Sequence, residues 1–266
     1  MDLKIKGKTV IITGSGNGLG RAIALGLAAE GAKVVVADLK KQDAEKVSAE
    51  IKTAGNESLA VSCDATNPDD VEQMVQKTLE AYGDIDILVN NVGGGFDTGF
   101  VVKTSIDIWD KTIELNLKSA FLCCRAVAPV MMKNKKGRII NISSVSGRQG
   151  EPLLGPYCAA KFGIAGFTQV LAKELARFEI TVNAVCPGYV YTPGWEKLAQ
   201  LLKDAYPSHA AKSLEEIFAE RVKSVTPLGR PQTAEEIASL VAYLASEEAR
   251  SITGQSISID GGIFMN

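Results

Sequence analysis

The chain has 266 residues, of which 46% are hydrophobic and 23% charged, and its formal net charge is −2. A chain of this length buries about three quarters of the surface that its unfolded form exposes, so a full core needs no disulfides or structural metal. The near-neutral charge provides no basic face for nucleic acid, and no apolar run approaches the roughly 18 residues that a membrane span requires.

The N-terminal part of the chain is typical of a buried strand, a glycine-rich turn and a helix. The apolar stretch 8–12 runs into residues 13–20, with the sequence TGSGNGLG, and an apolar, periodic segment follows at 21–29. Glycines in such a turn let the backbone approach a pyrophosphate, which then lies at the positive end of the helix. The pattern therefore predicts a dinucleotide site.

A second apolar strand, residues 33–37, ends in Asp38, about 20 residues after the glycines, where an acid can accept hydrogen bonds from the adenosine ribose hydroxyls. A carboxylate at this position would repel a 2′-phosphate, and no arginine stands among the glycines. The sequence therefore favours NAD over NADP. Lys40 and Lys41 could reach such a phosphate, which weakens this preference, and a strand-end or N-cap role is the alternative for Asp38.

Strands and helices continue to alternate to about residue 190. Helices are predicted at 44–54, 68–82, 108–134 and from Tyr157 to about 178, and strands at 58–63, 85–89, 138–142 and 180–185. Amphipathic segments at 195–204 and 214–225 predict two more helices, and 256–260 could be a last strand. The alternation predicts an α/β fold, a doubly wound parallel sheet of Rossmann type with helices on both faces. Because we find no repeat and no linker, we expect residues 1–266 to form a single domain.

Tyr157 and Lys161 stand four residues apart in one predicted helix, so their side chains share a face. A phenol ordinarily titrates near pH 10, and a neighbouring fixed cation lowers its pKa toward the range in which it can act as an acid or base. The same spacing occurs by chance on many solvent-exposed helices. Its weight therefore depends on the other motifs of the chain.

The chemistry must rest on groups other than histidine or paired cysteines. His209 is the single histidine, and a Ser-His-Asp hydrolase would have to place it correctly. No C-x-x-C spacing occurs among the five cysteines, which we interpret as small buried side chains in a reducing compartment: Cys63, Cys123, Cys124, Cys158 and Cys186. We expect no metal site, and without a signal-peptide pattern we expect a cytoplasmic location.

Taken together, the motifs resemble the short-chain dehydrogenase/reductase family in order and spacing along essentially the whole chain. They are Thr13-Gly14-x-x-x-Gly18-x-Gly20, Asp64, Asn90-Asn91-x-Gly93, Asn116, Ser144, Tyr157-x-x-x-Lys161, Pro187-Gly188, Thr253-Gly254-Gln255 and Asp260-Gly261-Gly262. Val92 stands where the family usually has alanine, a small apolar change that should leave the turn intact.

The resemblance implies a role for each catalytic candidate. Tyr157 would exchange a proton with the substrate oxygen while hydride moves to or from the nicotinamide. Lys161 would lower the pKa of Tyr157 and bind the nicotinamide ribose. Ser144 would hold the substrate carbonyl, although Ser143 and Ser146 lie close to it in the sequence. Asn116 would sit at a break in its helix and hold a water that relays protons to Lys161.

The resemblance also implies the cofactor contacts. Asp64, with Ala65 beside it, would face the adenine, Asn91 and Gly93 would line the adenine-ribose side, and the segment after Pro187 would approach the carboxamide. The full expected set for NAD is Gly14, Asn17, Gly18, Leu19, Gly20, Asp38, Leu39, Asp64, Ala65, Asn91, Val92, Gly93, Tyr157, Lys161, Pro187, Gly188, Val190 and Thr192.

In the family, the region after Pro187-Gly188 forms a substrate lid, here about residues 189–226. Its Thr192-Pro193-x-Trp195 stretch looks similar to the lids of acetoin, butanediol and polyol dehydrogenases. Trp195 could wall a pocket for a small alcohol or pin the lid to the core. The resemblance thus implies an NAD-dependent oxidoreductase that interconverts a secondary alcohol and a ketone, with a small diol, hydroxyketone or polyol as the favoured substrate.

Two alternatives stay open. A 3-oxoacyl or hydroxysteroid reductase would share the catalytic set, although Asp38 argues against the NADPH use common in carrier-linked reductases. A non-catalytic NAD-binding regulator would not need Ser144, Tyr157 and Lys161 together. Family members are commonly tetramers built partly through the tyrosine helix and the C-terminal segment, so we expect a homotetramer, with no nucleic-acid or membrane partner.

Overall fold

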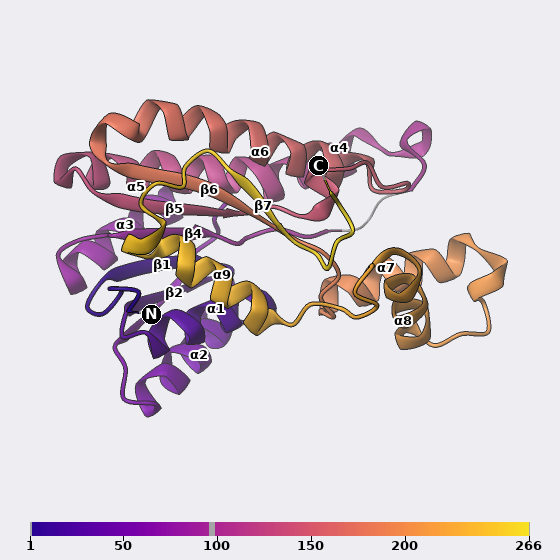
Figure 1. The fold of residues 1–266 in the computed structure, drawn as a ribbon, viewed down its shortest axis with the longest axis horizontal. Helices are drawn as coiled ribbons and strands as arrows, with labels where there is room; N and C mark the ends of the chain where they lie inside the picture. Colours follow the sequence, from indigo (N-terminus) through magenta and orange to yellow (C-terminus); the bar gives the residue numbers. More distant parts are fainter. Residues whose placement is uncertain (1, 96–98, 266) are drawn as a thin grey trace.

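The computed structural model describes residues 2–95 and 99–265, and its centre is one parallel sheet (Figure 1). The strand order is β3-β2-β1-β4-β5-β6-β7, and every neighbouring pair is parallel. The strands are β1 (Thr9–Thr13), β2 (Lys33–Asp38), β3 (Ser58–Ser62), β4 (Ile87–Asn90), β5 (Gly137–Ile142), β6 (Ile180–Pro187) and β7 (Ser256–Ile259). The predicted fold class is confirmed.

Successive residues of each central strand point to opposite faces of the sheet, which produces two separate cores. Val10 and Ile12 pack with α1 (Gly18–Ala29), α2 (Lys41–Thr53) and α9 (Ala234–Ala245). Ile11, between them, packs on the other face with α3 (Pro68–Tyr82), α5 (Ser119–Asn134) and α6 (Gly155–Leu175). Figure 1 shows α1, α2 and α9 below the sheet and α5 and α6 above it.

The sequence analysis did not predict α9, although its start carries a recognisable signal. Thr233 accepts a hydrogen bond from the Glu236 backbone, and the Glu236 carboxylate accepts one from the Thr233 backbone. This reciprocal pattern is a capping box, which fixes the first turn of a helix. The apolar face of α9 then completes the core against α1.

The helix predicted at 108–134 is divided in the structure. It consists of α4 (Ile106–Ile113), a π-helical turn (Glu114–Lys118) and α5. By length and composition the whole segment Ile106–Asn134 is apolar enough to cross a membrane, with a mean hydropathy of 1.2 in its most apolar window, but half of that window is buried. Leu122, Cys123 and Met131 lie in the core, so packing on the sheet accounts for this apolar composition.

The segment 189–226, which we call the lid segment, carries α7 (Pro193–Ala205) and α8 (Leu214–Val225), and the two helices predicted there are present. They project beyond the sheet at the right of Figure 1. They pack on each other around a small apolar cluster of their own that includes Trp195, Ile217 and Phe218. The lid segment is therefore attached to the sheet through its two ends and through few side chains.

Buried amides fix α6 on the sheet. The Asn90 Nδ2 donates to Asn141 Oδ1 at 2.8 Å, and the Asn141 Nδ2 donates to Thr168 Oγ1 at 2.9 Å. These three residues stand on β4, β5 and α6, and all are buried. The amide chain sets the position of the helix that carries Tyr157 and Lys161.

Asn141→Ala should lower the free energy of unfolding by about 2 to 4 kcal/mol, because it removes the bonds that Asn141 makes to the buried Asn90 and Thr168 side chains and leaves Asn90 only its bond to Cys124. Urea unfolding followed by circular dichroism measures this loss. Asn134→Ala, which removes an exposed bond to Asp84, serves as the control and should cost less than about 0.5 kcal/mol. Equal losses for both variants would contradict a structural role for the chain of amides.

Candidate active site

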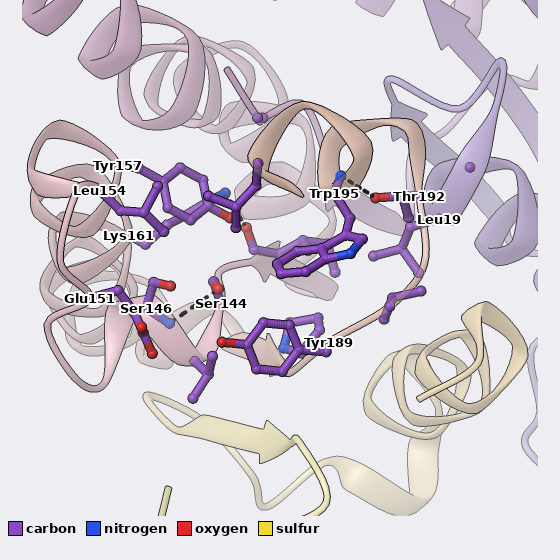
Figure 2. A pocket seen from close by; sticks show the side chains of 18 of the residues that line it. Leu19, Ser144, Ser146, Glu151, Leu154, Tyr157, Lys161, Tyr189, Thr192 and Trp195 are labelled. Carbon is purple, nitrogen blue, oxygen red and sulfur yellow. Dashed lines mark hydrogen bonds between the residues drawn. The ribbon is translucent and has the colours of Figure 1, made fainter. Parts of the chain in front are cut away.

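One cavity of about 860 Å³ opens between the sheet and the lid segment. It is lined by the glycine-rich loop, by the segments that follow β2 to β6, by the first turns of α6 and by α7 and α8. Of the residues predicted for the cofactor and for catalysis, all except Asn116 line this cavity. Figure 2 shows the part of it that contains Ser144, Tyr157 and Trp195.

The glycine-rich loop adopts a conformation that its glycines require. Gly14 and Gly18 have φ angles of 62° and 52°, in the left-handed region, and a Cβ on Gly20 would collide with the Gly14 carbonyl and the Asn91 side chain. Asn91 donates from Nδ2 to the carbonyls of Thr13 and Gly14 at 3.0 and 2.9 Å. Asn91 thus braces the loop as well as lining the cavity.

The N-terminus of α1 suits an anion. Its first turn contains no acidic residue, and the side chain of Asn17, at the N-cap, does not cap it. The backbone N–H groups of this turn and the helix dipole therefore favour a negatively charged group such as a pyrophosphate.

Asp38 is held at one end of the cavity. Its carboxylate accepts from Gly16 N at 2.8 Å and from Lys40 N at 3.0 Å, and the residue is 8% exposed. A Cβ on Gly16 would meet this carboxylate at 2.9 Å, so Asp38 requires glycine there. The sequence analysis gave Gly16 no separate role. Asp38 therefore stabilises the local turns through these two hydrogen bonds and also lines the cavity.

Asp64 follows β3 and is fixed by its neighbours. Its Oδ1 accepts from Thr66 N at 2.9 Å and from Thr66 Oγ1 at 2.7 Å, while its backbone N–H donates to Asp70. Ala65 beside it also lines the cavity, as does exposed Leu39 after β2. The carboxyl ends of β2 and β3 thus form a common wall.

Three serines follow β5, and their environments differ. Ser144 Oγ hydrogen-bonds the Tyr157 phenol and accepts from Ser146 N at 3.1 Å. Ser143 is buried, and its hydroxyl donates to the Lys161 carbonyl at 3.0 Å. Ser144 is therefore the serine that stands with Tyr157 at the cavity, as Figure 2 shows.

Lys161 and Asn116 meet behind Gly93. The Lys161 ammonium donates to the Ile142 carbonyl at 3.0 Å and lies 5.6 Å from the centre of the Tyr157 ring. A Cβ on Gly93 would contact Asn116 Oδ1 at 2.7 Å and Lys161 Nζ at 2.9 Å. The Asn116 and Lys161 side chains therefore both lie against the backbone of Gly93.

Asn116 lies in the π-helical turn, the break expected in its helix, and is 1% exposed. Its Oδ1 accepts from Gly94 N at 2.9 Å, and its Nδ2 donates to the carbonyls of Gly94 and Thr112. The residue does not line the cavity itself. It holds the Gly93–Gly94 backbone that does.

Burial dominates the electrostatics of the pair. Burial raises the pKa of Tyr157 to about 12, partly offset by the hydrogen bond from Ser144, and lowers the pKa of Lys161 to about 8. The Tyr157 pKa is thus raised on balance rather than lowered, because desolvation disfavours both charged forms. That Lys161 lowers the Tyr157 pKa stays a prediction.

The segment after β6 forms the wall opposite the sheet. The Gly188 N–H donates to Ile259 O at 3.1 Å, and Pro187, Gly188, Val190 and Thr192 line the cavity. Trp195 packs edge-on against Tyr189 and Phe218, with ring centres 5.3 and 5.0 Å apart. Trp195 is thus both a wall of the cavity and part of the lid segment's own cluster, and it does not pin the lid to the main core.

A polar group that the sequence analysis missed lies in the same cavity. Arg221 of α8 donates from Nη2 to Glu151 Oε2 at 2.8 Å and from Nε to the Tyr189 hydroxyl at 2.9 Å. Glu151 and Arg221 are 70 positions apart, and no local pattern pairs residues at that separation. His209 also lines the cavity, with its ring against Tyr206.

Over residues 2–95 and 99–265, no cluster of three His, Cys, Asp or Glu side chains is placed to hold a metal ion. The cysteines described there are all buried and unpaired.

Comparison with known proteins finds relatives along nearly the whole chain. A family model described as enoyl-(acyl carrier protein) reductase matches residues 14–264. A 3-oxoacyl-(acyl-carrier-protein) reductase of Synechocystis is 40% identical over 260 residues, 97% of each chain, and one of Thermotoga maritima is 37% identical over 261 residues, 98% of this chain and 99% of the relative. The crystal structure of an NAD⁺-bound xylitol dehydrogenase superposes with a TM-score of 0.92 at 30% identity, covering 97% of this chain and 100% of the other.

Lys161→Met should change how stability depends on pH. Because burial lowers the folded-state pKa of Lys161 from 10.5 to about 8, the unfolded chain binds more protons than the folded protein between these values, and this residue makes the free energy of unfolding rise with pH there. Urea unfolding from pH 7.5 to 10.5 should therefore show wild type gaining about 2 to 3 kcal/mol relative to the variant.

The control for this titration is Lys173→Met, at an exposed position of the same helix. Its stability difference from wild type should stay flat over the same pH range. If the stability difference between wild type and Lys161→Met also stayed constant with pH, burial would not lower the pKa of Lys161.

Proposed function

Because the chain belongs to the short-chain dehydrogenase/reductase family and is an oxidoreductase acting on CH–OH groups, we propose that it interconverts a small secondary alcohol and its ketone with NAD as cofactor. The observation that carries this proposal is the arrangement of Ser144, Tyr157 and Lys161 on one wall of the cavity, with Asp38 at its far end. A regulator that only binds NAD would not need that arrangement.

Tyr157 is the general acid and base in this proposal. It gives a proton to the substrate oxygen when a ketone is reduced and takes one when an alcohol is oxidised. Ser144 donates a hydrogen bond to the same oxygen and holds it beside the phenol. A nicotinamide bound in the cavity supplies or accepts the hydride.

Lys161 has two roles here. Its ammonium binds the nicotinamide ribose hydroxyls and stabilises the Tyr157 phenolate whenever that form is reached. Asn116 keeps the Gly93–Gly94 backbone against Lys161 and, through a water, relays protons to the ammonium. The bonds from Asn116 to both backbone groups of Gly94 support this placement.

The residues at the glycine-rich end fit a dinucleotide. The first turn of α1 would hold the pyrophosphate, and Asp38 would accept the ribose hydroxyls and repel a 2′-phosphate, which favours NAD. Asp64 and Ala65 would face the adenine, Asn91, Val92 and Gly93 the adjoining ribose, and Pro187, Gly188, Val190 and Thr192 the carboxamide. That all of them line one cavity supports the assignment.

A diol, hydroxyketone or polyol is the substrate class that we favour, and the likeness to an NAD⁺-bound xylitol dehydrogenase supports it. The likeness to 3-oxoacyl-(acyl-carrier-protein) reductases supports the second candidate, reduction of a 3-oxoacyl thioester. Both substrates would use the same Ser144 and Tyr157, so the lid segment decides between them.

We further propose a cytoplasmic homotetramer. Phe121 of α5 and Phe162 and Val170 of α6 are large apolar side chains that lie about half exposed on adjoining helices. Apolar side chains grouped on one face mark an interaction surface, and a second copy of the same helices would cover it.

Tyr157→Phe tests the catalytic assignment. It should lower kcat by at least about 100-fold because the proton donor is lost, while NADH binding, followed by fluorescence titration, stays close to that of wild type. Tyr243→Phe on α9, outside the cavity lining, is the control and should keep full activity. Substantial turnover by Tyr157→Phe would remove Tyr157 from the mechanism.

Asp38→Asn tests the cofactor preference, since it removes the charge and keeps the shape of the side chain. The ratio of kcat/KM for NAD to that for NADP should fall by about tenfold or more, because like-charge repulsion of a 2′-phosphate is worth several kcal/mol. Asp43→Asn, near the same loop but outside the cavity lining, is the matched control. An unchanged ratio in Asp38→Asn would mean that Asp38 does not read the ribose.

A further inference from the structure

Glu151, Tyr189 and Arg221 form a connected polar group in the part of the cavity that the catalytic assignment does not use. Arg221 bridges the other two at 2.8 and 2.9 Å, and all three side chains line the cavity. Figure 2 shows the Tyr189 hydroxyl on the side of its ring that faces Glu151, with Ser144 in the same part of the view. The group thus shares the cavity with Ser144 and Tyr157.

The charges of this region are balanced in pairs. Glu151 is paired with Arg221, and Glu220, which also lines the cavity, is paired with Lys212. No uncompensated cation among these four residues is available for a carboxylate or phosphate, and a bound anion would face the Glu151 carboxylate. A neutral ligand is favoured.

The group can both donate and accept hydrogen bonds. Glu151 accepts, the Arg221 guanidinium has five N–H donors, and the Tyr189 hydroxyl, which already accepts from Arg221, can donate its own proton. A hydroxyl group also donates and accepts, so it can use the hydrogen-bonding capacity that the three residues keep beyond their mutual bonds, whereas a methylene would leave that capacity unused at a cost.

The other side chains that the lid segment contributes to the cavity lining are mainly apolar. Leu198, Leu202 and Ile217 line the cavity with Trp195, whose indole Nε1 has no partner among the described residues. A ligand in this space would thus meet these apolar side chains beside the Glu151–Tyr189–Arg221 group, since Tyr189 packs against Trp195.

We propose that Glu151, Tyr189 and Arg221 determine substrate specificity by hydrogen-bonding hydroxyl groups remote from the reacting carbon, so that the preferred substrates are neutral polyols and hydroxyketones. This inference rests on the proposed oxidoreductase function and names the residues that select the substrate. Acyl thioesters and alcohols without further hydroxyls are used less well, because they leave the donors and acceptors that the group keeps beyond its mutual bonds without a partner.

The test compares substrates of equal carbon number: xylitol against 2-pentanol, and 2,3-butanediol against 2-butanol, each with NAD. We expect wild type to prefer the polyhydroxylated member. Tyr189→Phe should lower this preference in kcat/KM by about twofold to tenfold, and Arg221→Met by about tenfold or more, the loss typical of bonds to neutral and charged groups respectively. For the monohydroxy alcohols, kcat/KM should fall less than for their polyhydroxylated partners.

Two controls match these variants. Tyr191→Phe removes a neighbouring hydroxyl that bonds Glu215 at 3.3 Å, and Arg230→Met breaks an ion pair with Glu236, and neither residue lines the cavity. Both should keep the wild-type preference. If Arg221→Met does not fold, the substrate preference of Tyr189→Phe still tests the inference, because this variant lacks a single oxygen atom and should fold.

The outcomes separate the inference from the function on which it rests. Equal losses for both members of each pair, or an unchanged preference, would overturn the inference and leave the oxidoreductase assignment standing. No turnover of any alcohol, ketone or acetoacetyl thioester, with NAD or NADP, would overturn the proposed function. In that case, calorimetric titration of the NADH-loaded protein with xylitol tests the inference separately. Weaker xylitol binding by Tyr189→Phe and Arg221→Met than by wild type supports the inference. Equal binding by wild type and variants, or no detectable binding by any of them, overturns it.

Discussion

The burial of Lys161 is the constraint on which the rest of the site depends. Moving an ammonium out of water is costly unless it is bonded, and here it is 3% exposed with its Nζ on the Ile142 carbonyl. The backbone carbonyl of Lys161 accepts from Ser143 Oγ. The side chain and the backbone of Lys161 thus both bond to the segment at the end of β5, which joins this segment to α6. Tyr157 stands one turn before Lys161 on α6, and its position is therefore set by these bonds.

Small residues surround this lysine because the space is already filled. A Cβ on Gly93 would meet Nζ, and a Cβ on Gly147 would meet the Lys161 carbonyl at 2.7 Å and Ser143 Oγ at 2.5 Å. Asn116 reaches the same place only because its helix opens into a π-helical turn. The cost of a buried cation is thus met by backbone contacts that also shape this wall of the cavity.

The sequence predicted the strands, α3 and α8 well because these elements carry local signals, which are short apolar runs for the strands and periodic apolar positions for the helices. It also placed the glycine-rich loop, Asp38, Ser144 and Tyr157 on what proved to be one cavity, because the carboxyl ends of neighbouring parallel strands share an edge. The sequence did not predict that burial raises the Tyr157 pKa, since i,i+4 spacing reveals a neighbouring charge but says nothing of burial. Likewise, the ion pair of Glu151 with Arg221 joins residues 70 positions apart and has no local signature.

The Glu151–Arg221 pair shows how far similarity to known proteins can predict a substrate. The chain is 40% identical to a 3-oxoacyl-(acyl-carrier-protein) reductase and 30% identical to a xylitol dehydrogenase of nearly the same fold. Both likenesses extend over the residues for which we propose the catalytic roles, Ser144 and Tyr157, and these would act on the reacting oxygen whatever the remainder of the substrate is. In our proposal the groups that contact that remainder come from the loop before α6, from the segment after β6 and from α8. Reaction class therefore follows from the whole chain, whereas we propose that substrate choice follows from contacts such as those that Arg221 makes with Glu151 and Tyr189.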